Sequence, residues 1–402
     1  AILTFAVLFG LFSSRGKDWD RIKPFLLKSG LLFAVFAASA GLALINGFRV
    51  DSIAEHFKII INGLFIYMVI RMILWLGQIR KCDIYFAIVS GVAIFYIVKL
   101  VVLGMLLSGK LDLMQFATGM EDMLGNDLNW VTEPTEGVLR IQLPNEIVGI
   151  FALGLLWFSD IRILHSRFWY SVISILILVG VLSTMSRVFT VLIIVFMLLK
   201  LFRALKDTRN RMRTFLVASF SLVAVMGLLS TFLEKWLFRF SSEGGDGISE
   251  GVIIRSQQHN ALFYEFFRHP FFGLGIGGYC KDLIRLDAHP WMYETQTLAF
   301  AVQLGLVGTF FLVLLTLNRE VRAVLLGKVR LEWLCLGGAW LVASDSNPYL
   351  FSSLAGIIIW LIKQNLVVHC PSDGGPPTRC AHNVFPPPSC APSGGGTRAP
   401  HL

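Results

Sequence analysis

The sequence predicts an all-α fold, built as a polytopic bundle of membrane-spanning helices. The chain has 402 residues, of which 55% are hydrophobic and only 15% charged, and its mean hydropathy is +0.69. About a quarter of the residues of a soluble domain are charged. Apolar runs of about 20 residues, long enough to cross a bilayer as a helix, recur along the chain. Since lipid cannot pair backbone groups, each run is expected to form a helix.

Eleven apolar spans follow one another along the chain. They lie near residues 1–13, 29–47, 58–78, 84–107, 144–159, 168–185, 187–203, 214–232, 295–317, 331–346 and 348–367. The sequence opens inside an apolar run, without an initiator Met or a secretory signal pattern. We therefore expect a twelfth span in the full protein if its N-terminus is cytoplasmic.

The loops between the spans predict which way the bundle faces. Alternate loops are rich in Lys and Arg, and short loops of this kind stay on the cytoplasmic side. Their cations are Arg15, Lys17, Arg21, Lys23, Lys28, Arg80, Lys81, Arg162, Arg167, Arg203, Lys206, Arg209, Arg211, Arg213, Arg319, Arg322, Lys328 and Arg330. The same excess accounts for the formal net charge of +9, which therefore requires no nucleic-acid partner.

Two longer loops then lie on the outer side, at 108–143 and 233–294. The first is acidic, with six carboxylates against Lys110 and Arg140. The second begins with a Gly- and Ser-rich stretch, is helix-like near 252–268, and ends in turns marked by Gly and Pro. We expect the second loop to form a periplasmic loop domain.

The predicted organisation has four parts. They are spans one to eight in 1–232, the outer loop in 233–294, the last three spans in 295–369, and a tail in 370–402. The tail is rich in Pro, Gly, Ser and Cys, a composition that predicts disorder. The six cysteines of the chain show no CxxC spacing, so neither a zinc site nor a disulfide framework is indicated.

Three ionisable residues fall on the outer side of the predicted bundle. Arg187 lies between two spans, Arg255 lies in the long outer loop, and Glu294 opens the span that follows. Ionisable groups at membrane depth are costly and usually functional. Arginine offers phosphate a fixed fork of donors. Two guanidinium groups and one carboxylate on one side therefore suggest a site that holds a diphosphate and removes a proton.

Each of these residues also has an ordinary structural explanation, which stays open. Arg187 can extend its side chain to lipid headgroups. Arg255 and His259 are four residues apart and share one face of an amphipathic helix that can lie on the membrane. Glu294, in the first turn of a helix, can serve as a partner of the helix dipole. A helix lying on the membrane is compatible with a catalytic role, because a lipid-linked substrate arrives from that surface.

The histidines supply further candidates. His269 and His289 are rival bases, but each precedes a proline in a loop and can serve only to shape the turn. His289 ranks first among the histidines, below Glu294. His259, His289 and Arg140 are added to the two arginines as substrate-binding candidates.

The segment Gly273-Leu-Gly275-Ile-Gly277-Gly278 satisfies the pattern GxGxxG. That pattern indicates dinucleotide binding only after a strand and before a helix in a βαβ unit. No such unit surrounds it, and we reject a nucleotide site. The glycines are expected to allow a compact turn or a close approach of backbones.

Several short motifs, taken in order, resemble the O-antigen ligase and Wzy polymerase superfamily of bacterial envelope glycosyltransferases. They are Pro144-Asn145 at the start of a span, Ser186-Arg187 between spans, Arg255 some 14 residues before His269-Pro270, the turn His-Pro-Phe-Phe-Gly-Leu-Gly, and Gly305-Leu-Val-Gly308. Together they cover roughly residues 140–310.

The resemblance implies a GT-C-like helical fold in the bacterial inner membrane, with an active site facing the periplasm. It implies an undecaprenyl-diphosphate-linked oligosaccharide as donor, a glycan or the lipid A-core as acceptor, and neither a metal nor another cofactor. Arg187 and Arg255 match the arginines thought to grip the donor diphosphate. Ligases of the superfamily typically have His-Asn where this chain has Glu294 followed by Thr295.

The resulting hypothesis is a membrane glycosyltransferase. Glu294 removes a proton from an acceptor hydroxyl, and Arg187 and Arg255 stabilise the departing diphosphate. Because the ligase histidine is replaced, a polysaccharide polymerase comes first and an O-antigen ligase second. A transporter or flippase of lipid-linked sugars is the alternative from another class. Membrane lipid is a partner in every case, and the resemblance leaves open a chain-length regulator.

Overall fold

The computed structural model describes most of the chain. The described residues are 19–75, 77, 79–124, 131–135, 138–141, 146–161, 163–164, 166–184, 186–206, 246–284, 289–344 and 354–367. The spans predicted near 1–13 and 214–232, and the tail predicted from residue 370, lie outside these residues.

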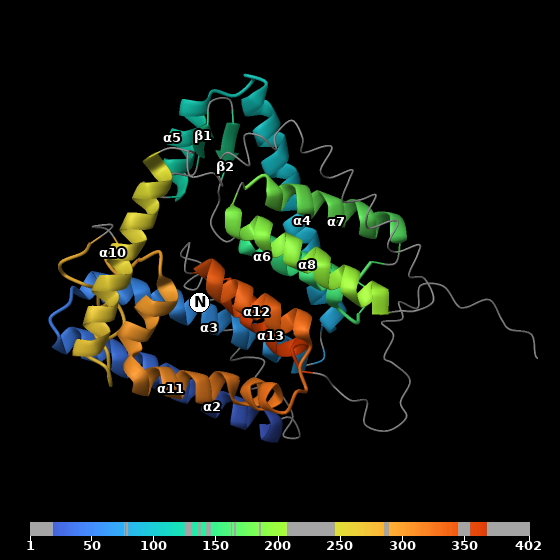
Figure 1. The fold of residues 1–402 in the computed structure, drawn as a ribbon. Helices are drawn as coiled ribbons and strands as arrows, with labels where there is room; N and C mark the ends of the chain where they lie inside the picture. The colour runs from blue at the N-terminus through green and yellow to red at the C-terminus, as the bar shows by residue number, and fades with distance from the viewer. Residues whose placement is uncertain are drawn as a thin grey trace, which may run out of the picture. The chain divides into compact units, whose positions relative to one another are not determined.

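Helices make up nearly all of the described regular structure (Figure 1). In chain order they are α2 (Trp19–Ile45), α3 (Val50–Trp75), α4 (Lys81–Leu107), α5 (Leu113–Leu124), α6 (Ile147–Phe158), α7 (Arg167–Leu182), α8 (Arg187–Lys206), α10 (Asp246–Arg268), α11 (Gln296–Leu325), α12 (Leu331–Ser344) and α13 (Ala355–Asn365). One antiparallel pair of strands accompanies them, β1 (Val131–Thr135) and β2 (Val138–Ile141). The predicted helical fold is therefore confirmed for the part of the chain that the structure describes.

Each predicted span that falls within the described residues overlaps a helix. Among those residues, four helices are long and apolar enough to cross a membrane, namely Lys23–Ile45, Val50–Trp75, Lys81–Leu107 and Gln296–Leu325. Helices α6, α7 and α12 are apolar but shorter. These features support a membrane-embedded protein, whereas the total of eleven or twelve spans and the periplasmic loop domain stay predictions.

The acidic loop predicted at 108–143 contains regular structure that its composition did not reveal. Helix α5 follows Asp112, whose carboxylate accepts a hydrogen bond from the Gln115 N–H at 2.9 Å. Such a bond satisfies a backbone donor that the first turn of a helix leaves without a partner. Strands β1 and β2 then pair with each other, and Thr132 lies opposite Arg140. The loop is thus a short helix followed by a hairpin.

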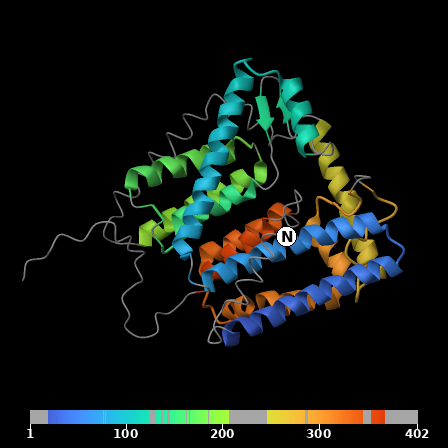
Figure 2. The same cartoon turned by 180° about the vertical axis from the view of Figure 1, so that it is seen from behind.

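The helices pack in two groups (Figures 1 and 2). In the first group, α6 and α7 each contact both α4 and α8. In the second group, α2 lies against α3 and α11, and α10 lies against α11. Helix α13 packs on α3 and also touches α6, whereas α12 contacts α6, α8, α11 and α13. Helices α12 and α13 therefore join the two groups.

Helix α6 forms the centre of the first group. Its residues Ile147–Leu156 and Phe158 are buried. A helix that is apolar all round is surrounded by protein or lipid, and here the surroundings are α4, α7, α8 and α12. Two glycines, Gly149 on α6 and Gly180 on α7, form a notch for the Tyr96 ring of α4, because a Cβ on either would lie within 2.3 Å of that side chain. This close approach locks three helices together.

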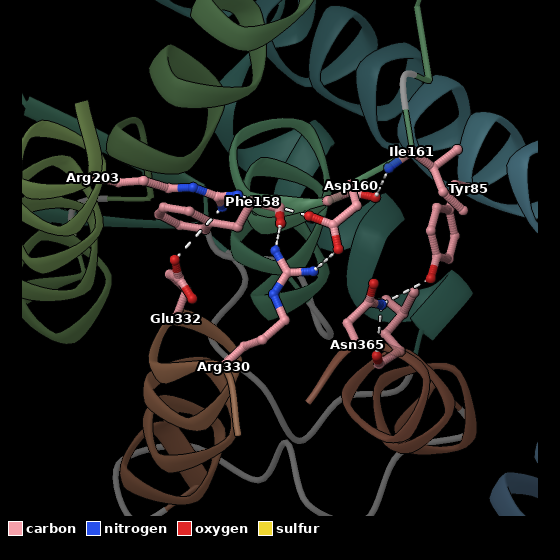
Figure 3. Close-up of polar contacts among 10 residues, drawn as sticks. Tyr85, Phe158, Asp160, Ile161, Arg203, Arg330, Glu332 and Asn365 are labelled. Carbon is pink, nitrogen blue, oxygen red and sulfur yellow. Dashed lines mark hydrogen bonds and ion pairs between the residues drawn. The ribbon is translucent and has the colours of Figure 1, made fainter. Parts of the chain in front are cut away.

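Polar contacts connect residues at or next to the ends of α4, α6, α8, α12 and α13 (Figure 3). The pairs are Arg330 with Asp160, Arg203 with Glu332, and Asn365 with Tyr85, at 2.5, 3.6 and 2.8 Å. Arg330 also donates to the carbonyl of Phe158. The ends of α6 and α8 and the start of α12 all adjoin loops whose basic residues predict the same membrane side. The contacts therefore agree with the alternating directions predicted for these helices.

Helix α11 is broken at Gly305, whose φ of 63° and ψ of −175° are not helical. An unbroken helix would bond the N–H of Leu306 to the carbonyl of Val302, and the N–H of Val307 to the carbonyl of Gln303. In an apolar environment, four backbone groups without partners would be strongly destabilising. Their partners here come from another segment.

The turn that follows α10 supplies all four partners. The N–H groups of Leu306 and Val307 donate to the carbonyls of Pro270 and Phe271, at 2.8 and 2.9 Å. The N–H groups of Leu274 and Gly275 donate to the carbonyls of Val302 and Gln303, at 3.0 and 2.9 Å. Two helical bonds are thus exchanged for four bonds between segments.

Glycines make the exchange sterically feasible. A Cβ on Gly273 would lie 2.4 Å from the carbonyl oxygen of Val302, and one on Gly305 would lie 2.5 Å from the backbone of the turn. Gly275 and Gly277 approach the backbones of α2 and α3 equally closely. Gly273, Gly275 and Gly277 all have positive φ. The GxGxxG segment is therefore a packing turn with close backbone approach, as predicted.

The close approach can be tested with alanine. Gly305 and Gly327 have nearly the same φ, 63° and 65°, but a Cβ on Gly327 meets nothing within 4 Å. Alanine carries the cost of a positive φ at both positions, and the ψ of −175° makes this cost larger at Gly305, because that combination is adopted essentially by glycine alone. Only Gly305→Ala also displaces the turn, so we expect it to lower the free energy of unfolding clearly more than Gly327→Ala. Unfolding of the purified chain in detergent measures both, and equal losses would contradict the close-approach role.

Candidate functional site

Two of the three predicted catalytic side chains meet in the structure. Arg255 Nε donates to Glu294 Oε2 at 2.6 Å, an ion pair that joins α10 to the segment just before α11. The side chain of Arg255 is 43% exposed and that of Glu294 is 16% exposed. The guanidinium is thus accessible to a ligand, whereas the carboxylate lies deeper.

Gln258 holds the backbone of the same glutamate. Its side-chain oxygen accepts a hydrogen bond from the Glu294 N–H at 2.9 Å, and the residue is 1% exposed. Gln258 is three residues after Arg255, so the two side chains project from one face of α10. Helix α10 therefore fixes Glu294 twice, by its carboxylate and by its main chain. Sequence reasoning missed Gln258, because a glutamine on a polar helix carries no distinctive signal.

Tyr293 anchors the segment that precedes α11. Its phenol oxygen accepts a hydrogen bond from the Cys280 N–H at 2.7 Å and donates to the Leu283 carbonyl at 3.3 Å. Burial raises the pKa of the Tyr293 phenol above its ordinary value, and burial raises the pKa of the Cys280 thiol to about 11. Both groups therefore stay protonated near neutral pH, and neither competes with Glu294 as a base.

His289 lies against a carboxylate on a different helix. Its Nδ1 is 2.9 Å from Glu55 Oε2 near the start of α3, with side chains 28% and 42% exposed. The buried ring of Trp291 lies beside it, with centroids 6.0 Å apart, and stacks on His56 at 4.0 Å. A carboxylate at one ring nitrogen orients an imidazole. Sequence reasoning named His289 but missed Glu55, because 234 residues separate the two.

The other two candidate histidines, His259 and His269, have local contacts. The His259 ring stacks on Phe263, one turn further along α10, with centroids 6.2 Å apart. His269 Nε2 lies 3.8 Å from Glu265 Oε2. As predicted, Arg255 and His259 are carried by the same helix. His269 follows the last residue of that helix and opens the turn that joins α11.

Two predicted arginines are placed by their backbones only. Arg187 is the first residue of α8, and Arg140 lies in β2 opposite Thr132. Their side chains lie outside the described residues, so their contribution to an anion site stays a prediction. Within the described ranges, no three His, Cys, Asp or Glu side chains are grouped closely enough to hold a metal ion.

A second, fully buried ion pair was not predicted. Lys99 Nζ, in the second half of α4, lies 2.5 Å from Glu146 Oε1 at the start of α6, with side chains 1% and 0% exposed. The phenol of Tyr96 donates to the Glu146 carbonyl at 3.3 Å. Lys99 lies within a predicted span. Because hydropathy is averaged over many residues, a single cation among apolar neighbours does not stand out. Glu146 follows the Pro144-Asn145 motif, but its partner could not be read from the sequence.

Comparisons of the chain with family models, with curated proteins and with solved structures gave no match.

The buried ion pair between Lys99 and Glu146 gives a direct test of the packing of α4 on α6. Removing one partner leaves the other charge buried and unpaired, which costs about 3–5 kcal/mol. We therefore expect Lys99→Met to lower the free energy of unfolding strongly, and Lys99→Met combined with Glu146→Gln to recover most of the loss. The measurement is unfolding in detergent of the single and double variants. A double variant as unstable as the single variant would show that the two residues are not coupled.

Proposed function

We propose that this chain is an inner-membrane glycosyltransferase that uses a polyprenyl-diphosphate-linked glycan as donor. The observation that carries the proposal is the Arg255–Glu294 pair, which brings a cation suited to phosphate and a carboxylate suited to a proton within 2.6 Å. The ordered motifs that resemble the O-antigen ligase and Wzy polymerase superfamily support the same donor class. The apolar helices support a site that is reached from the membrane.

The proposed reaction is a single displacement. Glu294 accepts the proton of an acceptor hydroxyl as the acceptor oxygen forms a bond to the anomeric carbon. The bond between that carbon and the diphosphate oxygen breaks, and its electron pair leaves with the diphosphate. Arg255 stabilises the negative charge that develops on the diphosphate. This is effective because the guanidinium is already oriented before the reaction. Arg187 is assigned the same role. Inversion at the anomeric carbon follows.

The ion pair of the free protein fits this scheme. Arg255 contacts Glu294 through Nε, and a guanidinium binds phosphate more strongly when it presents two parallel donors. A diphosphate that takes Nε as one of these two donors therefore competes with Glu294 for the guanidinium. Release of the carboxylate would make it available to the acceptor hydroxyl only after the donor is bound. The buried contact between Gln258 and the Glu294 N–H keeps the backbone of this residue in place during the change.

Within the enzyme class, polymerisation of glycan repeats is the first assignment. Glu294 occupies the position at which the ligases of the superfamily typically carry histidine, and it can act as a base in its place. Ligation to the lipid A-core is the second assignment, because it uses the same donor chemistry.

The break in α11 is the observation that favours a transporter of lipid-linked sugars. Broken helices form the ion and substrate sites of many transporters, whose unwound backbone groups coordinate the cargo. Here the carbonyls of Val302 and Gln303 and the N–H groups of Leu306 and Val307 are all bonded to the turn after α10. The two N–H groups therefore have no hydrogen left to offer a ligand, and each of the two carbonyls already accepts a hydrogen bond. The break therefore supports a structural role, and the enzyme is preferred.

The proposal is tested by changing one carboxylate at a time. We expect Glu294→Gln to reduce glycan transfer by about 10²–10⁴-fold, the usual contribution of a general base. The measurement is conversion of a polyprenyl-diphosphate-linked oligosaccharide by the purified, reconstituted chain.

Glu265→Gln is the matched control. Glu265 is 15% exposed, close to the 16% of Glu294, and also pairs with an arginine of α10. It should leave transfer within a few-fold of the unchanged chain. Transfer at the normal rate by Glu294→Gln would reject Glu294 as the base, and equal losses in the two variants would indicate a general effect on α10.

A further inference from the structure

A groove runs along α4 at the seam between the two helix groups. It encloses about 740 Å³ and is lined mostly by apolar residues of α3, α4, α6 and α13 and of the segments next to them, with the carboxylates of Asp83 and Glu146. Ala87 and Gly91 of α4 form its floor and are exposed. They are four residues apart, so they lie on one helix face and leave a hollow between larger neighbours such as Ile84 and Ile88. We call this feature the seam groove.

The seam groove has the length of one lipid chain. Its lining on α4 extends from Asp83 to Tyr96, and at a rise of 1.5 Å per residue this is about 20 Å. The hydrocarbon core of a bilayer is about 30 Å thick and contains two leaflets, so one acyl chain extends over about 15 Å. Near Tyr96 the lining includes Glu146, whose carboxylate is held by Lys99. That buried pair gives this end of the groove a polar boundary.

The opposite end of the groove adjoins a cluster of cations. Its lining there includes Ile70 and Ile79, which are close in sequence to Arg71 of α3 and Lys81 of α4. Arg71 and Arg319 lie near enough to Lys81 to interact with it electrostatically.

A fourth cation and one carboxylate complete the surroundings. Lys363 of α13 interacts with Arg71 and Arg319 and lies 2.9 Å from Glu320. Asp83, at the mouth of the groove, is paired with Arg80 at 3.1 Å. The described interactions therefore place Glu320 among four cations, beside the Arg80–Asp83 pair. Like charges this close repel one another, and a bound anion would relieve the repulsion.

We propose that the seam groove binds one anionic phospholipid, with its phosphate at the cation cluster and one acyl chain along α4. Two independent observations favour this occupant. The groove is largely apolar and open along a helix long enough to cross a membrane. The cation cluster adjoins one of its ends, whereas the cation near the other end, Lys99, is paired with Glu146. Basic pockets between membrane helices bind anionic headgroups in this way. The lipid would fill the seam between the two helix groups, and the proposal does not depend on the glycosyltransferase activity.

The experiment titrates phosphatidylglycerol, and in parallel phosphatidylcholine, into the detergent-solubilised full chain and counts bound lipid by native mass spectrometry. Phosphatidylglycerol should bind more tightly. Lys81→Gln and Arg319→Gln should each weaken its binding about fivefold, which corresponds to about 1 kcal/mol per cation near a lipid headgroup. Binding of phosphatidylcholine should change little. Lys110→Gln, an exposed lysine just beyond the other end of α4, is the control for charge.

Binding of the lipid's acyl chain in the groove is tested by a separate pair of variants. Gly91→Leu should fill the groove and weaken the binding of both lipids, because a Cβ at Gly91 meets nothing within 4 Å. Gly104→Leu is the control, since Gly104 lies on the same helix with equally open space but outside the groove. Leucine has the higher helix propensity, so neither change should unfold α4. Equal binding of the two lipids by the unchanged chain, or equal effects of Gly91→Leu and Gly104→Leu, would overturn the proposal.

Discussion

Main-chain pairing at the break in α11 is the constraint on which the second helix group depends. Lipid offers no hydrogen bonds, so a helix cannot break in an apolar environment unless another segment pairs the exposed backbone groups. The turn after α10 provides these bonds. It is itself held from the other side, where the Gly277 N–H donates to His56 Nδ1 and its carbonyl accepts from Ser52 Oγ. Helices α3, α10 and α11 are thereby linked through one short segment.

This constraint explains why the ion pair forms where it does. Arg255 lies on the helix that leads into the turn, and Glu294 lies eleven residues before the break. Fixing the turn in the break sets the position of α10 along α11. With α10 in that position, Arg255 and Gln258 reach the carboxylate and the backbone of one residue. The site is therefore assembled by packing at a distance from its own side chains.

The sequence predicted the parts of the structure that depend on local patterns. Apolar runs indicated the helices, and the unusual placement of ionisable groups indicated Arg255 and Glu294, which do meet. The glycine pattern was correctly assigned to close packing. By contrast, Gly305 lies in a long apolar run, and glycine is common in membrane helices, so nothing local indicated that α11 breaks there.

Partners that are distant in sequence were also beyond prediction. Glu55 and His289 are 234 residues apart, and Lys99 and Glu146 are 47 apart. Each pair requires a particular packing of helices, which hydropathy does not specify. The regular structure in loop 108–143 was missed for a different reason. Its signals, such as the cap at Asp112, are short and common in coil.

The turn after α10 has a consequence for how the protein is made. It rests on Ser39, Ser52 and His56, which leave the ribosome more than 220 residues before it. Helices α2 and α3 are therefore inserted while these three polar side chains still lack the turn as a hydrogen-bond partner, and the first helix group is synthesised in the meantime. The contacts between the turn and its neighbours are complete only when the second half of α11 has been synthesised. Until then the early helices are candidates for transient shielding by the insertion machinery, so assembly of the site is a late event in biogenesis.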